Sequence, residues 1–94
     1  MKIHELKLHY SYYDLVAGEE KTFEVRKDDR GFQVGDALHL REWIDEKDWV
    51  DGSAKQKEGF TERSCIAKIT CILHEHEGIT EGYVVLGITL LHRT

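Results

Sequence analysis

The sequence contains no proline and only two cysteines, Cys65 and Cys71, among its 94 residues. Two cysteines are too few for a disulfide-stabilised secreted miniprotein, so the chain must rely on a hydrophobic core. No apolar run approaches the roughly 18 residues that a membrane-spanning helix needs. The N-terminal segment MKIHELKL is charged throughout and lacks the apolar stretch of a signal peptide. These absences predict a cytoplasmic protein that does not enter a membrane.

Positive charge is also in short supply. Thirteen Lys and Arg residues face eighteen Asp and Glu residues, which gives a formal net charge of −5. A protein that coats duplex DNA or an anionic membrane needs a basic surface, so this balance argues against both partners. A nucleic-acid partner would have to be small and locally recognised.

The composition is nevertheless that of a folded domain. Apolar residues make up 40% of the chain, aromatic residues 10% and charged residues 33%, which argues against intrinsic disorder. The length allows one domain, spanning residues 1–94, because typical domains contain about 100–150 residues. We expect a monomer by default.

Hydrophobic periodicity predicts mostly strands. A short first strand falls within residues 2–8, and further strands are predicted at 22–26, 37–43, 63–73 and 83–91. A helix is expected to start at Ser11 as N-cap and stop at Gly18, with Tyr12, Leu15 and Val16 on one face. Residues 44–60 are expected to form a long polar loop. The pattern indicates a strand-dominated mixed α/β fold, a small barrel.

Strand alternation assigns side chains to faces. Residues 83–91 are apolar on both faces, which predicts a central strand. In residues 63–73, Cys65 and Cys71 fall on the same face about 20 Å apart, too far to bond, and are expected to be small core residues. Among the histidines, His74 and His76 have a chelating spacing, but the sequence places no third ligand. We therefore predict no metal and no cofactor.

The densest polar group is Lys21-Thr22-Phe23-Glu24-Val25-Arg26. In an extended strand Thr22, Glu24 and Arg26 point to one side, with Lys21 at the entry. Two cations and a carboxylate facing one cleft can hold a planar, hydrogen-bonding ligand. The alternative is a salt-bridge ladder on a solvated face, worth under about 1 kcal/mol per pair.

This segment, with FQVGD at 32–36 and LHLREW at 38–43, resembles the ASCH superfamily of PUA-like domains. Within it the sequence is most similar to small uncharacterised bacterial and phage proteins with the pattern KTFE[IV]RK-x-DR-x-FQVGD-x-L-x-LREW. The resemblance implies a PUA-like pseudo-β-barrel of five to six strands with one or two short helices. It also implies a cleft lined by Lys21, Glu24 and Arg26, and a structural turn at Gly35 and Asp36. The superfamily is proposed to bind RNA or modified nucleotides.

Two positions depart from the superfamily pattern. The usual G-x-K at the helix end is Gly18-Glu19-Glu20-Lys21 here, so the glycine lies one residue early. One branch of the superfamily hydrolyses N4-acetylcytidine with a Lys and a Thr three residues later, and that second position is Glu24 in this chain. The nucleophile of that branch is therefore not matched.

Three functions follow as hypotheses. The leading one is binding of RNA or a modified nucleotide, short and single-stranded, through Lys21, Glu24, Arg26 and Lys27, with Trp43 as a stacking ring. The second is a small amidohydrolase for acylated nucleosides, with Lys21 and Glu24 as its catalytic candidates. Catalysis is less favoured because neighbouring cations weaken a carboxylate as a base. The third is a phage- or host-protein interaction domain that uses the 44–60 loop.

Overall fold

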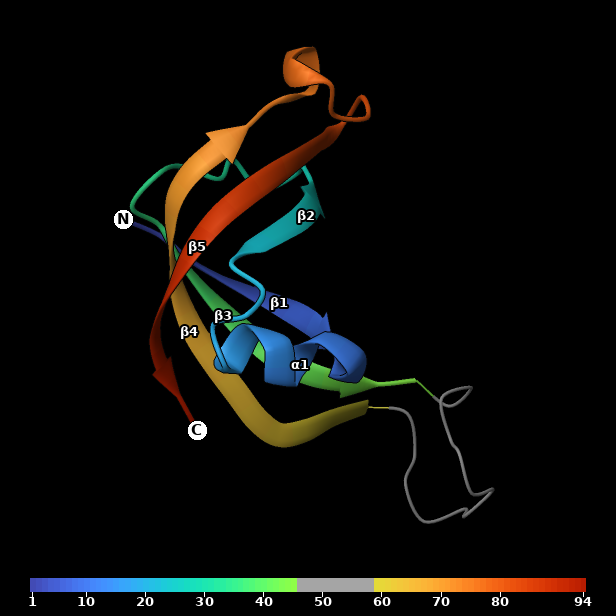
Figure 1. Cartoon of the computed structure of the whole chain (residues 1–94), viewed down its shortest axis with the longest axis vertical. Helices are drawn as coiled ribbons and strands as arrows, with labels where there is room; N and C mark the ends of the chain where they lie inside the picture. The colour runs from blue at the N-terminus through green and yellow to red at the C-terminus, as the bar shows by residue number, and fades with distance from the viewer. Residues whose placement is uncertain (46–58) are drawn as a thin grey trace.

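The computed structural model describes residues 1–45 and 59–94. These residues form five strands, one α-helix and one short 3-10 helix (Figure 1). The elements in chain order are β1 (Ile3–His9), α1 (Tyr10–Ala17), β2 (Phe23–Lys27), β3 (Ala37–Ile44), β4 (Gly59–Leu73), η2 (Glu75–Glu77) and β5 (Tyr83–Arg93). All five predicted strands and the predicted helix are confirmed.

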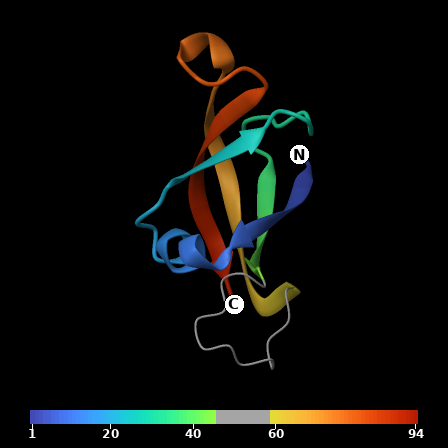
Figure 2. The same cartoon turned by 90° about the vertical axis from the view of Figure 1, so that its right-hand side faces the viewer.

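The strands form one curled sheet in the order β1-β3-β4-β5-β2. The β1–β3 pair is parallel, and the other three pairs are antiparallel. The strands β1 and β2 are therefore the two edges of a half-barrel, and α1 links them on its open side (Figure 2). The strand β5 lies between β4 and β2, as its apolar character on both faces predicts. The fold is a strand-dominated α/β pseudo-barrel.

The hydrophobic core fills the concave side of this sheet. Three residues of α1, Tyr13, Val16 and Ala17, pack onto it from the open side. The core consists of Leu6, Leu8, Tyr13, Val16, Ala17, Phe32, Leu38, Leu40, Cys65, Ala67, Ile69, Val84, Leu86 and Ile88. Because alternate residues of each strand face the same side, the inner positions of β3, β4 and β5 supply most of this list.

The start of α1 differs from the prediction. Its N-cap is His9, whose ring nitrogen Nδ1 accepts a hydrogen bond from the Ser11 backbone N–H at 3.3 Å, and Ser11 lies inside the first turn. The buried face of the helix also differs from the expected one, although Val16 belongs to both. Tyr12 and Leu15 are 49% and 39% exposed, while Tyr13 is buried.

The end of α1 is a Schellman motif with glutamate in the position that usually holds glycine. The Glu19 and Glu20 N–H groups donate to the carbonyls of Val16 and Leu15, at 3.0 and 2.9 Å. Gly18 ends the helix with an ordinary φ of −88°, whereas Glu19 adopts the left-handed φ of 62°. The early glycine noted in the sequence therefore leaves a non-glycine residue in the strained position.

A bulge in β4 overturns the prediction for Cys71. The β4–β5 register shifts between Ile69 and Cys71, so Thr70 is an extra residue in the pairing. One extra residue turns all following side chains to the opposite face. Cys65 is buried as expected, but Cys71 is exposed on the convex face, and Leu73 is 46% exposed.

The expected 44–60 loop is shorter at both ends. Ile44 belongs to β3, and Gly59 and Phe60 begin β4, where they pair with Ile44 and Trp43. The remainder of that prediction lies outside the described residues. In the part of the chain that the structure describes, no helix has the length and apolar character needed to cross a membrane.

Candidate ligand-binding site

The strand β2 presents its polar face to the interior of the barrel. Glu24 and Arg26 lie opposite Leu86 and Val84 of β5, two residues of the core. On the outer face Phe23 and Val25 are 46% and 52% exposed. The predicted alternation of residues 22–26 is confirmed. The more hydrophobic face of the strand, however, is the one that lies outside. A polar face can point inward only if its charges find partners there.

Glu24 finds those partners in two cations. Its side chain is 6% exposed, and its carboxylate oxygens lie 3.2 Å from Lys21 Nζ and 3.4 Å from Arg26 Nη2. The structure thus brings together Lys21, Glu24 and Arg26, the three residues that the sequence pattern predicts to share a cleft. We call these three residues the charged triad.

Both cations are also fixed by backbone groups. Lys21 Nζ donates to the carbonyl of Phe23 at 2.8 Å, and Arg26 Nη2 donates to the carbonyl of Lys7 at 2.7 Å. Lys7 belongs to β1, so Arg26 bridges the two edge strands of the curled sheet. The Lys21 backbone N–H donates to the carbonyl of Leu15, which fixes the triad to the end of α1. Arg26 therefore has a structural role in addition to any role toward a ligand.

Two buried atoms of the triad have no hydrogen-bond partner among the described residues, namely Glu24 Oε1 and Arg26 Nε. Lys21 Nζ is within ion-pair distance of Glu24 Oε1, but its hydrogen bond goes to the backbone. A buried polar atom that lacks a hydrogen bond costs about 1–3 kcal/mol, so folded proteins seldom leave one. One acceptor, which is ion-paired with Lys21, and one donor of the triad thus lack hydrogen bonds among the described residues.

Two hollows flank the triad. One, of about 140 Å³, is lined by Leu6, Arg26, Lys27, Asp29, Arg30 and Phe32. The other, of about 80 Å³, lies beside Lys21 against Val16, Ala67 and Ile88. Ligand pockets usually measure about 300–1,000 Å³. These hollows therefore suit the edge of one base or one phosphate group, and not an enclosed nucleotide.

The described residues around Glu24 offer little for nucleophilic chemistry. Burial, and secondarily the charge of Glu24, raises the pKa of the Cys65 thiol to about 11. A thiol with that pKa is protonated at neutral pH and is a weak nucleophile. The buried Cys65 thiol is therefore not an activated nucleophile.

Of the two remaining predicted ligand-binding residues, Lys27 lies beside the triad and Trp43 lies apart from it. Lys27 is exposed at the end of β2 and lines the 140 Å³ hollow. Trp43 lies on the outer face of β3, where the Lys7 ammonium is 3.8 Å from its ring centroid and the Phe60 ring is 4.8 Å away. Trp43 therefore does not share the inner face of the sheet with Glu24.

The predicted turn at Gly35 and Asp36 organises the start of β1. Gly35 has a φ of 96°, which glycine adopts without strain. The Asp36 carboxylate accepts hydrogen bonds from the backbone N–H groups of Gln33 and Lys2, both at 3.1 Å, and lies 2.8 Å from His4 Nε2. Its hydrogen bonds, first of all that with His4, lower the Asp36 pKa to about 2.

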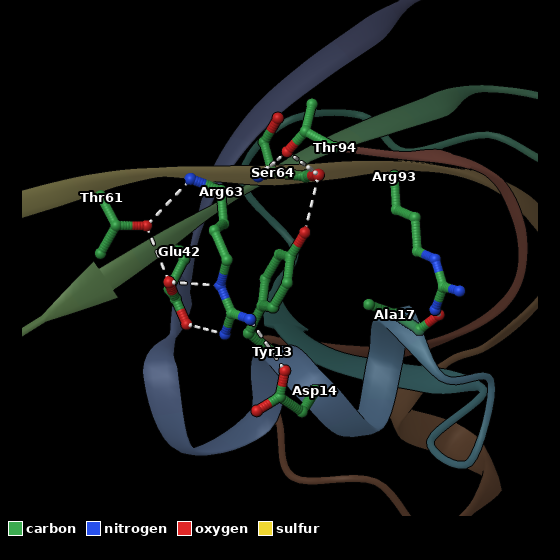
Figure 3. Close-up of polar contacts among 9 residues, drawn as sticks. All are labelled: Tyr13, Asp14, Ala17, Glu42, Thr61, Arg63, Ser64, Arg93 and Thr94. Atoms are coloured by element: carbon green, nitrogen blue, oxygen red, sulfur yellow. Dashed lines mark hydrogen bonds and ion pairs between the residues drawn. The ribbon is translucent and has the colours of Figure 1, made fainter.

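Sequence reasoning missed a second polar cluster, between α1 and the sheet (Figure 3). Arg63 of β4 forms a two-pronged pair with the buried Glu42 of β3, at 3.0 and 2.7 Å. It also lies 3.1 Å from Asp14 and stacks over the Tyr13 ring at 4.3 Å. One signal was available, because Glu42 follows Leu38 and Leu40 at inward positions. Its partner, 21 residues away, had no local signature.

The fold and site together define a small α/β pseudo-barrel with a charged triad on the inner face of one edge strand. Residues 3–88 match the family described as "Domain of unknown function (DUF3850)", and the chain belongs to that family. The chain is also similar to the "Uncharacterized 12.9 kDa protein in GpA 3'region" of Escherichia phage P2, with 39% identity over 85 residues. That match covers 90% of this chain and 66% of the phage protein, just under two thirds of its length.

Proposed function

We propose that this domain binds a nucleotide or a short single strand of RNA through Lys21, Glu24 and Arg26, as a module of the PUA-like ASCH type that its sequence resembles. The observation that carries the proposal is the buried triad, with an acceptor at Glu24 Oε1 and a donor at Arg26 Nε left without hydrogen bonds among the described residues. A ligand that reaches these atoms must present a donor to Glu24 Oε1, beside the Lys21 ammonium, and an acceptor to Arg26 Nε.

Nucleobases present such a pair. Cytosine and adenine carry an exocyclic amino group next to a ring nitrogen that accepts a hydrogen bond. In the proposed complex the amino group donates a hydrogen bond to Glu24 Oε1, and the ring nitrogen accepts one from Arg26 Nε–H. Single-stranded RNA exposes these edges, whereas a duplex uses them in pairing. The small flanking hollows and the net charge of −5 also favour one base over a duplex.

The test of this proposal substitutes Glu24. Glu24→Gln keeps the shape of the side chain and replaces one acceptor oxygen by an NH2 donor, which opposes a base amino group. Arg26→Ala is less informative because Arg26 also donates to the Lys7 carbonyl and closes the sheet edge. The matched control is Glu5→Gln, an exposed carboxylate on the outer face of β1.

We expect titration of the wild type with nucleosides and tetranucleotide RNAs to shift the backbone amide NMR signals of β2 residues. Glu24→Gln should bind about 10-fold more weakly or worse, because losing a buried hydrogen-bond partner costs about 1–3 kcal/mol. Glu5→Gln should bind like the wild type. An unchanged β2 spectrum at millimolar ligand, or equal losses in the two variants, would reject the proposal.

The hydrolase hypothesis is distinguished from the binding hypothesis by a reaction product, the deacylated nucleoside. Chromatography of acylated nucleosides incubated with the wild type detects any deacylated product. Turnover that disappears in Lys21→Ala would make this site an active site. The protein-interaction hypothesis concerns residues outside the described part of the chain, and it stays a prediction.

A further inference from the structure

The hollow at the end of β2 has a composition distinct from that of the triad. We call it the β2-end hollow. It is lined by Leu6, Arg26, Lys27, Asp29, Arg30 and Phe32. Three of these residues are basic and one is acidic. In a chain of net charge −5, this local excess of two positive charges is a departure from the rest of the molecule.

We propose that the β2-end hollow is an anion subsite that holds the phosphate of the nucleotide whose base contacts Glu24. The inference rests on the proposed function and adds the ligand class: a phosphorylated nucleotide or one phosphodiester of a strand, rather than a free base. Arg26 belongs to both places, since it contacts Glu24 and also lines the hollow.

The spacing along β2 agrees with such a ligand. Glu24 and Arg26 share a face, and a strand rises about 3.3 Å per residue, so their side chains leave the strand about 6.6 Å apart. A ribose bridges a base and its 5′-phosphate over a distance of this order. Because Arg26 also lines the hollow, a base held at Glu24 and Arg26 lies beside the hollow, and its 5′-phosphate can enter it.

The charges of the hollow are available to an anion. Arg30 Nε lies 3.9 Å from Asp29 Oδ1, and the two side chains are 48% and 61% exposed. An exposed pair at that distance is weak, so the guanidinium can turn to a phosphate at little cost. Arginine binds phosphate through paired N–H donors, and Lys27 adds a point charge.

The other walls limit the size of the ligand. Leu6 and Phe32, both buried, close one side with apolar surface that can pack against a sugar ring. The volume of about 140 Å³ leaves room for one phosphate group, not for a series of backbone phosphates. The site consequently differs from the extended basic surface that non-specific nucleic-acid binding requires.

The test compares nucleosides with their 5′-monophosphates, using calorimetry and NMR on the full chain. The variant is Lys27→Ala with Arg30→Ala, which leaves the triad intact. The matched control is Arg41→Ala with Lys68→Ala, two basic residues of the exposed outer face. The amide spectra of both double variants verify that they are folded.

We expect the monophosphate to bind at least about 10-fold more tightly than the nucleoside, because charge-assisted hydrogen bonds to phosphate are strong. The Lys27/Arg30 variant should lose this preference and bind the nucleoside within about twofold of the wild type. The control should keep the preference. Added salt should weaken monophosphate binding in the wild type more than in the Lys27/Arg30 variant.

Further arms separate the sources of phosphate and the two proposals. If a dinucleotide without a terminal phosphate binds the Lys27/Arg30 variant more weakly than it binds the wild type, the occupant is an internal phosphodiester. Equal affinity for nucleoside and monophosphate overturns the anion subsite and leaves base binding intact. Binding of inorganic phosphate alone, lost in the Lys27/Arg30 variant, supports the subsite while base recognition fails. No binding of any of these ligands overturns both proposals.

Discussion

Glu19 shows how one residue can hold a helix end at a cost. In a Schellman motif the residue after the C-cap takes a left-handed conformation, which glycine adopts freely and other residues adopt with strain. In this chain the glycine is the C-cap itself, Gly18, and Glu19 takes the left-handed position with a φ of 62°. Lys21 follows two residues later, so this turn also positions the triad.

We therefore expect Glu19→Gly to stabilise the protein by about 1 kcal/mol, because a left-handed L-residue costs about 1–2 kcal/mol and glycine loses part of that gain as chain entropy. Urea unfolding monitored by circular dichroism measures the change. Glu20→Gly removes the same charge from a residue whose φ is not left-handed, and it should not stabilise. Equal effects in the two variants would assign the gain to charge instead.

At the residue scale the sequence predicted which side chains meet, but not which way they face. The grouping of Lys21, Glu24 and Arg26 follows from strand alternation and from the family resemblance. The inward direction of Glu24 did not, because Phe23 and Val25 are the more hydrophobic face and are nonetheless exposed. Its burial is tolerable because its carboxylate pairs with Lys21 and Arg26.

At the scale of elements, α1 is held to the sheet by the Glu42–Arg63 cluster (Figure 3). Arg63 binds the buried Glu42 with two hydrogen bonds and reaches Asp14 on the helix, while the Tyr13 hydroxyl donates to the Ser64 carbonyl at 2.8 Å. The helix has only eight residues, too few to be stable alone in water. Its stability must come from this contact and from its buried face.

We expect Arg63→Met to destabilise the protein by about 2–4 kcal/mol, because it leaves the buried Glu42 carboxylate with Thr61 as its remaining hydrogen-bond donor. Adding Glu42→Met should recover most of the loss, since the pair is then replaced by apolar groups. Chemical denaturation of the single and double variants measures both terms.

The control for this pair is Asp14→Asn, which removes only the exposed end of the Arg63 contacts. The Asp14 side chain is 81% exposed, so the loss should stay below about 1 kcal/mol. If the double variant were as unstable as Arg63→Met alone, an unpaired Glu42 charge would not be the cause.

Element positions were predictable where hydrophobic periodicity was uninterrupted, and they failed at local irregularities. The five strands, and the place of β5 inside the sheet rather than at an edge, follow from hydrophobic periodicity. The reversal after Thr70 does not, because a β-bulge depends on pairing with β5 and leaves no pattern in β4 itself. The start of α1 was missed as well, since the His9 cap lies two residues before the serine that sequence statistics favour.

For the molecule as a whole, several carboxylates are more acidic than usual because they are paired in the folded state. The pKa of Asp36 falls from 3.8 to about 2, and the pKa values of Glu42 and Glu5 lie below 4.5 because of hydrogen bonds from Arg63 and Arg41. A group whose pKa is lower when folded adds stability above its unfolded pKa, and this stability disappears as the pH falls.

We expect the free energy of unfolding to decrease as the pH falls from about 5 to 2. In Asp36→Asn, which cannot titrate, the decrease between about pH 4 and 2 should be shallower, and the starting stability lower. Urea titrations at half-unit pH intervals measure the slope. Asp29→Asn, at an exposed carboxylate, should follow the wild-type curve. An unchanged slope in Asp36→Asn would show that this group does not contribute to acid unfolding.

The β4 bulge has a practical consequence for the two thiols. Because it turns Cys71 outward while Cys65 stays buried with its pKa raised to about 11, maleimide reagents should modify Cys71 selectively in the native protein. A fluorophore attached there would sit on the convex side of the sheet, opposite the triad. The wild-type chain can thus be labelled at Cys71 without any substitution, and the inner face toward which Glu24 points stays unmodified.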